Sequence, residues 1–243
     1  MLIAGNWKLN CNINEASELV KRLINSKADK SLNYEMVVFP PFTALSEVSK
    51  LLINSHIALG AQDCSSEIKG AFTGDISAEM LADVGCKYVI VGHSERRLNR
   101  GDDDSIVFKK ATNAQNYNLV PIICVGESAD DRNNGEALNV IRKQLEHSLP
   151  LKCNKLNCVI AYEPIWAIGS GLIPTVKDIN DMFSMIKGWL FDKYNDSSIM
   201  LLYGGSVNND NVKELFSCPD LGGLLIGGVS LKADEFSRIC KNI

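Results

Sequence analysis

Short runs of apolar residues recur along the chain, and each run is continuous rather than alternating with polar residues. Continuous apolar runs are typical of strands that are buried on both faces, as in a parallel sheet. The runs are "LIAG" (2–5), "MVVF" (36–39), "IALGA" (57–61), "YVIVG" (88–92), "LVPIICVG" (119–126), "CVIAY" (158–162), "IMLLYGG" (199–205) and "LGGLLIGG" (221–228). The pattern therefore predicts eight buried strands.

Segments with a helical spacing of apolar residues lie between these runs. Helices are expected over residues 14–25, 102–116, 175–194 and 208–217. Asp102 to Asp104 place negative charge where a helix N-terminus favours it. Thr175 and Asp178 have the spacing of a capping box, and Pro219 is a stop signal after the last segment.

Strand and helix alternate eight times within 243 residues. This order predicts an α/β protein with a single domain over residues 1–243, a (β/α)8 barrel of eight parallel strands ringed by helices. Before the motifs are considered, a doubly wound open sheet is the structural alternative.

Composition narrows the class of partner. The 25 basic and 29 acidic residues give a net charge of −4 with both signs scattered, which disfavours a nucleic-acid groove or a basic membrane face. No apolar stretch approaches the roughly 20 residues of a membrane span, and the N-terminus lacks a targeting signal, so we expect a cytoplasmic protein. The eight cysteines form no C-x-x-C pair. We expect them to be reduced thiols, and with three histidines the composition disfavours a zinc site.

Polar residues follow several of the predicted strands, where sites form in parallel β/α folds. Asn6 and Lys8 follow the first run, His93 the fourth and Glu163 the sixth. A lysine there can offset substrate charge, and a neutral imidazole can donate a hydrogen bond to a substrate oxygen. A carboxylate in a water-poor pocket is a stronger base toward a carbon acid than one in bulk water.

A structural ion pair with Arg96 or Arg97 is the competing interpretation of Glu163. Glu95 and Glu127 suit such a pair better, because each follows a strand among polar neighbours.

Glycine pairs end the last two runs, at Gly204–Gly205 and Gly227–Gly228. They leave backbone N–H groups bare for an anion, and the loops after strands 7 and 8 are a recurrent phosphate site of barrel enzymes. We also expect helices to open at Ser206 and after Gly228, which favours phosphate; simple tight turns are the alternative. The whole set suggests proton abstraction beside the carbonyl of a small phosphorylated substrate.

The sequence resembles the triosephosphate isomerase family along essentially its whole length. The matching stretches are "GNWKLN" (5–10), "GAFTGD" (70–75), "VGHSERR" (91–97), "CVGE" (124–127), "AYEPIWAIGSG" (161–171), "YGGSV" (203–207) and "GGVSLK" (227–232). The resemblance implies interconversion of dihydroxyacetone phosphate and D-glyceraldehyde 3-phosphate, in glycolysis and gluconeogenesis, without cofactor or metal.

The resemblance also implies residue roles. Glu163 would be the base, and His93 the electrophile that polarises the carbonyl through an enediolate. Asn6 and Lys8 would be the substrate-binding pair, with Lys8 stabilising the developing negative charge. The implied backbone phosphate ligands are Gly169, Ser206, Gly227 and Gly228. The implied supporting residues are Ser94, Glu95 and Cys124. Residues 164–174 would form a lid that excludes water.

The family is usually a homodimer, so the resemblance implies a second copy of the chain as partner. Residues 70–75 match the loop that enters the other subunit, where Thr73 is expected near the partner's site and Phe72 at an apolar tip.

Several positions depart from the family pattern. Asp63, Asp75 and Ser170 replace the usual Asn, Glu and Thr, and "LIP" (172–174) replaces the frequent "KTA". Pro174 restricts this hinge; we expect the lid still to close, with kinetics that differ.

Two other functions compete with the isomerase. An aldolase-like barrel enzyme would need a Schiff-base lysine or a metal set, and Lys8 is the only lysine placed at a strand end. A non-enzymatic scaffold would be expected to have lost Glu163, His93 or Lys8, and all three are present.

Overall fold

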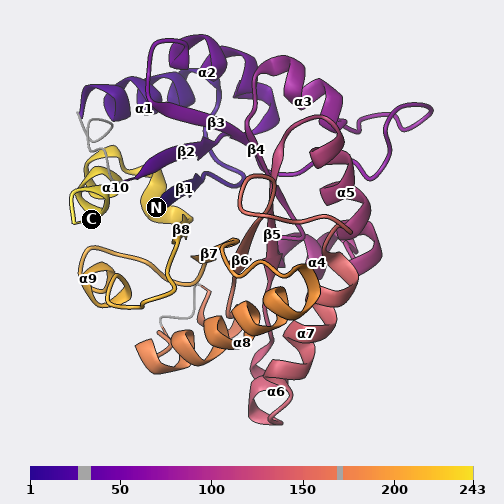
Figure 1. Ribbon diagram of the computed structural model, residues 1–243. Helices are drawn as coiled ribbons and strands as arrows, with labels where there is room; N and C mark the ends of the chain where they lie inside the picture. The colour runs from indigo at the N-terminus through magenta and orange to yellow at the C-terminus, as the bar shows by residue number, and fades with distance from the viewer. Residues whose placement is uncertain (27–33, 169–171, 243) are drawn as a thin grey trace.

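Eight parallel strands close into a barrel, with β1 paired to both β2 and β8 (Figure 1). The computed structural model describes residues 1–26, 34–168 and 172–242. The strands are β1 (Leu2–Asn6), β2 (Glu35–Phe39), β3 (Ile57–Ala61), β4 (Tyr88–Val91), β5 (Val120–Val125), β6 (Val159–Tyr162), β7 (Met200–Tyr203) and β8 (Gly223–Ile226). The closed barrel confirms the predicted fold class and excludes the doubly wound open sheet.

Helices ring the barrel on its outside (Figure 1). The α-helices are α1 (Ile13–Asn25), α2 (Leu45–Leu52), α3 (Ala78–Val84), α4 (Ser94–Arg100), α5 (Asp104–Asn116), α6 (Ala129–Asn133), α7 (Ala137–Ser148), α8 (Val176–Tyr194), α9 (Val212–Leu215) and α10 (Ala233–Cys240). Single 3-10 turns are η2 (Phe42–Ala44), η3 (Ile165–Ala167) and η4 (Gly228–Leu231).

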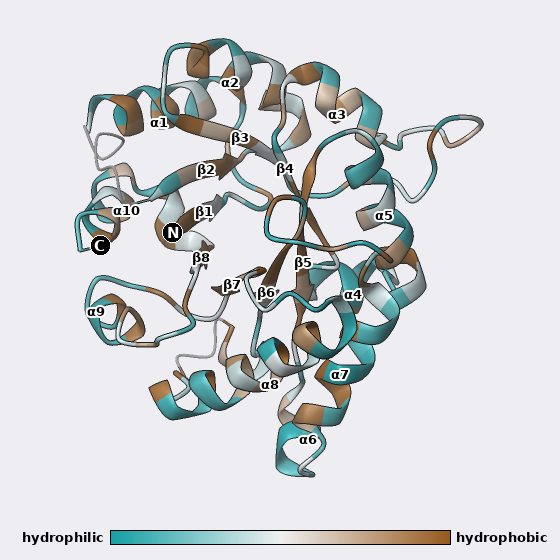
Figure 2. Cartoon of the chain, in the orientation of Figure 1, coloured by the Kyte–Doolittle hydropathy of each residue, from teal (hydrophilic) through white to brown (hydrophobic). Residues whose placement is uncertain are grey.

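Apolar residues on both faces of the strands are buried, as the continuous runs predicted. In β1, Leu2 and Ala4 belong to a small cluster that fills the barrel, while Ile3 belongs to the larger cluster beneath the helices. Figure 2 shows apolar strands surrounded by helices whose outer faces are more polar. Among the described residues, none of the helices combines the length and apolar character needed to cross a membrane.

The starts of two predicted helices, α8 and α5, test the capping argument. The box at the start of α8 is confirmed, because the backbone N–H groups of Thr175 and Asp178 each donate to the other's side chain at 3.1 Å. α5 begins at Asp104 rather than at 102, because the carboxylate of Asp103 caps it by accepting a 2.8 Å bond from Ile106.

The prediction of a helix over residues 208–217 is wrong for its first half. The Asn208 side chain accepts hydrogen bonds from the N–H groups of Asp210 and Asn211. This local turn competes with helix formation, so α9 covers only Val212–Leu215. Ser206 therefore lies in a loop and does not open a helix as predicted.

The ends of β5 and β6 are joined by a close backbone approach at Gly126. The N–H of Glu163 donates to the carbonyl of Val125 at 2.7 Å. A Cβ atom on Gly126 would lie 1.8 Å from the carbonyl oxygen of Glu163. Only glycine fits here, so this residue fixes how the backbone of Glu163 sits over β5.

We predict that Gly126→Ala lowers the free energy of unfolding by about 3 kcal/mol or more, because backbone must move to admit the methyl group. Gly188→Ala is the matched control. It lies inside α8 with no heavy atom near its Cβ position, and should raise stability by about 0.5–1 kcal/mol. Urea unfolding at one fixed protein concentration measures both, and equal stability of the two variants would contradict the close approach.

Candidate active site

A cavity of about 310 Å³ lies at the carboxyl end of the strands. It brings together most of the predicted site residues, which come from the ends of five strands. Those that line it are Asn6, Lys8, His93, Glu163, Ser206, Gly227 and Gly228. Gly169, the remaining predicted phosphate ligand, lies outside the described residues.

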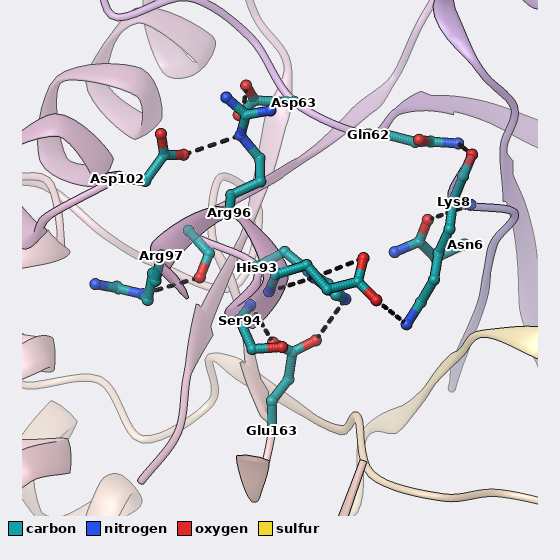
Figure 3. A network of polar contacts seen from close by, with 12 residues as sticks. Asn6, Lys8, Gln62, Asp63, His93, Ser94, Arg96, Arg97, Asp102 and Glu163 are labelled. Atoms are coloured by element: carbon teal, nitrogen blue, oxygen red, sulfur yellow. Dashed lines mark hydrogen bonds and ion pairs between the residues drawn. The ribbon is translucent and has the colours of Figure 1, made fainter. Parts of the chain in front are cut away.

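Glu163 follows β6 and is almost completely buried, with 2% of its surface exposed. One carboxylate oxygen accepts a 2.9 Å hydrogen bond from the backbone N–H of Ser94, and the other lies 3.1 Å from Nε2 of His93 (Figure 3). Burial of an unpaired carboxylate is costly, so these two donors are what hold it at the cavity wall.

His93 follows β4 and caps α4. Its Nδ1 accepts a hydrogen bond of 3.2 Å from the backbone N–H of Glu95. A ring nitrogen that accepts carries no proton, so the proton of the neutral imidazole is on Nε2. His93 therefore presents an N–H donor to the cavity, and in this structure that donor faces Glu163.

Contacts with neighbouring residues fix the backbone conformation of Lys8. Its φ is +53°, in the left-handed region that few non-glycine residues adopt. The Asn6 side chain accepts from the N–H of Lys8 at 3.0 Å, and Gln62 donates to its carbonyl at 2.8 Å (Figure 3). The ammonium group reaches Glu95 at 2.6 Å at the cavity edge. A fixed backbone thus aims a cation into the mouth of the barrel.

The glycine pairs after β7 and β8 also line the cavity. Within the described residues, the N–H groups of Gly205, Ser206, Gly227 and Gly228 donate no hydrogen bond. Gly204 lies against Glu163, because a Cβ there would be 2.8 Å from Cγ of that residue. This arrangement leaves a group of backbone donors for an anion.

The three predicted supporting residues all contact the catalytic candidates. Ser94 donates to Glu163 and Glu95 pairs with Lys8. Cys124 is buried beside Glu163, and burial first, then the charge of that carboxylate, raises the pKa of its thiol. Cys124 therefore packs as a neutral group against Glu163.

Arg96 and Arg97 do not pair with Glu163, so the competing ion-pair interpretation fails. Arg97 binds Asp104 at 2.6 Å. Arg96 lies 2.8 Å from Asp63 and 3.0 Å from Asp102. These contacts anchor α4, the helix that His93 caps.

Lys110 completes a buried charge cluster that the sequence analysis did not predict. Its ammonium group lies 2.9 Å from Asp63 and 2.7 Å from Asp102. Burial raises the pKa of Asp63, while the nearby Lys110 and Arg96 lower it. The negative charge of Asp63, which departs from the family pattern, is thus balanced by Arg96 and Lys110.

A second network surrounds Glu127, which is fully buried and which the sequence analysis favoured for a structural ion pair without naming these partners. It accepts hydrogen bonds from Tyr162 at 3.0 Å and from the Trp166 indole at 2.8 Å, and pairs with Arg132 at 3.1 Å. Arg132 also stacks on the Trp166 ring at 4.8 Å and binds Asp178 of α8 at 2.6 Å. One arginine therefore links the residues on both sides of segment 169–171.

Apolar residues complete the cavity wall, and the sequence analysis did not single them out. They are Ile168, Val207, Leu225 and Val229. Leu225 belongs to the cluster inside the barrel, and it could have been found by counting back two residues from Gly227.

Fold and cavity together define a class: a (β/α)8-barrel protein whose mouth carries a buried carboxylate, an imidazole donor, a lysine and an anion cradle. Within the described residues, no cluster of three His, Cys, Asp or Glu side chains could hold a metal ion.

Comparison with known proteins identifies the family. The sequence model for triosephosphate isomerase matches residues 1–243. The chain is 44% identical to the triosephosphate isomerase of Thermoanaerobacter pseudethanolicus, over 98% of this chain and 97% of that protein. It is 42% identical to that of Xanthobacter autotrophicus, over 99% and 96%. The crystal structure of triosephosphate isomerase from Bartonella henselae superposes with a TM-score of 0.92 at 39% identity, covering 99% and 98%. The chain belongs to the triosephosphate isomerase family.

Proposed function

We propose that this protein interconverts dihydroxyacetone phosphate and D-glyceraldehyde 3-phosphate through an enediolate. The observation that carries the proposal is one cavity lined by Glu163, His93, Lys8 and the two glycine loops. Each group meets one demand of the reaction: a base, a donor to the carbonyl oxygen, a cation and a phosphate site.

The phosphate of the substrate binds to the N–H groups of Ser206, Gly227 and Gly228, with Gly169 as a further ligand in the proposal. The N–H groups of Ser206, Gly227 and Gly228 donate no hydrogen bond within the described residues. Lys8 and Asn6 line the same cavity and hold the substrate beside these loops. Positioning of this kind supplies much of a catalytic rate.

Glu163 takes a proton from the carbon next to the carbonyl and returns it to the neighbouring carbon, while a second proton moves from the hydroxyl oxygen to the former carbonyl oxygen. The oxygen of the substrate competes for the Nε2–H of His93, which in the free protein faces Glu163 at 3.1 Å. Substrate binding therefore polarises the carbonyl and frees the carboxylate in one exchange. Lys8 stabilises the negative charge that develops on the enediolate.

A lid over residues 164–174 is proposed to exclude water during this step. The hydrogen bond from Trp166 to Glu127, near the start of this segment, and the cap of Thr175 on α8, just after it, support anchored ends. Exclusion of water strengthens the base and protects a reactive intermediate.

We predict that Glu163→Asp lowers kcat by about 10²-fold or more with little change in KM, because the shorter carboxylate no longer reaches the carbon. His93→Asn should lower kcat by a similar factor by removing the polarising donor. Glu18→Asp, on the exposed face of α1, is the control and should match the wild type. A coupled assay on glyceraldehyde 3-phosphate measures all three; undiminished turnover in either site variant would refute these roles.

A homodimer is the proposed assembly. The loop between β3 and α3 extends away from the barrel (Figure 1) and carries Phe72, 46% exposed, beside the exposed Thr73. The N–H of Ser65 donates to the carbonyl of Ile76 at 2.8 Å and closes the base of the loop. An apolar side chain on a braced, projecting loop favours burial against another copy.

We predict that sedimentation at micromolar concentration gives twice the 26.7 kDa mass of the chain. Phe72→Ser should raise the dimer Kd at least about tenfold, as loss of a buried aromatic anchor does. Phe191→Ser, another half-exposed Phe, on α8, is the control and should leave Kd unchanged. A monomeric wild type would contradict the proposal.

A further inference from the structure

Residues on both sides of Glu163 in the chain are hydrogen-bonded to Glu127. One carboxylate oxygen of this fully buried side chain accepts from the hydroxyl of Tyr162 at 3.0 Å and from the indole of Trp166 at 2.8 Å. The backbone carbonyl of Glu127 accepts from the N–H of Ile165 at 3.1 Å. Glu127 therefore holds the segment that carries Glu163.

The charge of Glu127 is balanced by Arg132 of α6. A buried carboxylate without a partner of opposite charge is costly. The guanidinium group of Arg132 lies 3.1 Å from the hydrogen-bonded oxygen of Glu127, and within the described residues it is the only cation paired with this side chain. The other oxygen is buried and accepts no hydrogen bond in that part of the chain. Without Arg132, burial would leave the carboxylate of Glu127 unpaired.

Two further contacts fix the guanidinium group of Arg132. It stacks on the ring of Trp166 at 4.8 Å and binds Asp178, near the start of α8, at 2.6 Å. The hydrogen bond from the Thr175 hydroxyl chiefly, with Arg132 among the smaller causes, lowers the pKa of Asp178, which therefore stays ionised near neutral pH. Arginine presents its donors in one plane, so it can join two carboxylates and an aromatic face at once, whereas lysine is a point charge.

We infer that Arg132 is a positioning residue for the proposed base: by holding Glu127 it fixes segment 162–166 and with it the place of Glu163 at the cavity wall. Arg132 is not among the described residues that line the cavity, so it acts through Glu127 and not on the substrate. The expected effect on turnover rests on the proposed isomerase function, whereas the expected effect on the place of Glu163 does not.

Glu163 is then held from two directions. The start of α4 donates to its two oxygens at 2.9 Å and 3.1 Å, and Glu127 fixes its neighbours in the chain. Reaction rates depend steeply on such placement, since a displacement of about 1 Å can cost about 10²-fold. Loss of Arg132 should therefore slow the chemical step and leave the glycine loops after β7 and β8 in place.

A purely structural role of Arg132 is the alternative. In that case the ion pairs would only join α6 to α8, and their loss would lower the free energy of unfolding. Neither kcat nor the contact between His93 and Glu163 would then change in a variant that still folds.

Kinetics of the purified full-length protein test the effect on turnover. Arg132→Met removes the charge, and we predict a kcat lower by about 10- to 100-fold with KM for glyceraldehyde 3-phosphate within about twofold. Arg132→Lys keeps the charge without the planar fork and should recover part of the loss. Arg22→Met, which breaks an exposed ion pair with Asp234, is the matched control and should have wild-type constants.

Nitrogen NMR of the three histidines tests the same inference without turnover. The contacts of Arg132 with Glu127, Asp178 and Trp166 do not reach His93. A change in the His93 Nε2 signal in Arg132→Met therefore reports that Glu163 has moved, and Arg22→Met should leave the signal in place. If the wild type proves inactive but this signal still shifts, the proposed function fails and the placement of Glu163 by Arg132 stands.

With an active wild type, the inference requires both changes. It is overturned if folded Arg132→Met keeps either the wild-type kcat or the wild-type His93 signal. Where Arg132→Met does not fold, Arg132→Lys decides by the same two measurements, and wild-type values in it would overturn the inference.

Discussion

The buried carboxylate of Glu163 needs two hydrogen-bond donors, and the start of α4 supplies both. The Ser94 N–H and the His93 Nε2 meet its two oxygens at 2.9 Å and 3.1 Å. An ionised carboxylate without such partners would be expensive to bury. The meeting requires β4 and β6 to end at the same height although β5 lies between them, which is what a closed parallel barrel provides. Gly126 sets the height of β6 over β5, and Gly204 leaves room for the side chain.

Only one of these donors can be exchanged. The Ser94 N–H is part of the backbone, whereas the Nε2–H of His93 faces the cavity. Because the Glu95 N–H donates to Nδ1, the ring proton is on Nε2. There it can donate a hydrogen bond to a substrate oxygen. In the proposed reaction, the substrate carbonyl therefore replaces the interaction that stabilises Glu163 in the free protein. The cluster of Arg96 with Asp63 and Asp102 anchors the helix on which this geometry rests.

The sequence predicted the strands well, because strands that are buried on both faces consist of continuous apolar runs. Burial of the strands in a closed barrel also determines where the residues at their ends point. For the same reason it predicted that Glu163, His93 and Lys8 would meet at the mouth of the barrel, where they line one cavity. It failed at 208–217, where the side chain of Asn208 makes a turn that helical spacing does not reveal. It also missed the contacts of Arg132 with Glu127, Trp166 and Asp178, because these join segments that only the folded barrel brings together. The tautomer of His93 is likewise invisible in sequence, since a backbone N–H determines it.

The position of the proton on His93 is therefore the central claim, and nitrogen NMR measures it directly. Protein labelled with 15N in its three histidines, studied near pH 8 with His93→Asn to assign the signal, reports which ring nitrogen is protonated. The account predicts a neutral ring with the proton on Nε2 and a bare Nδ1. A proton on Nδ1, or on both nitrogens, would contradict it, because His93 would then not donate from Nε2 as a neutral group.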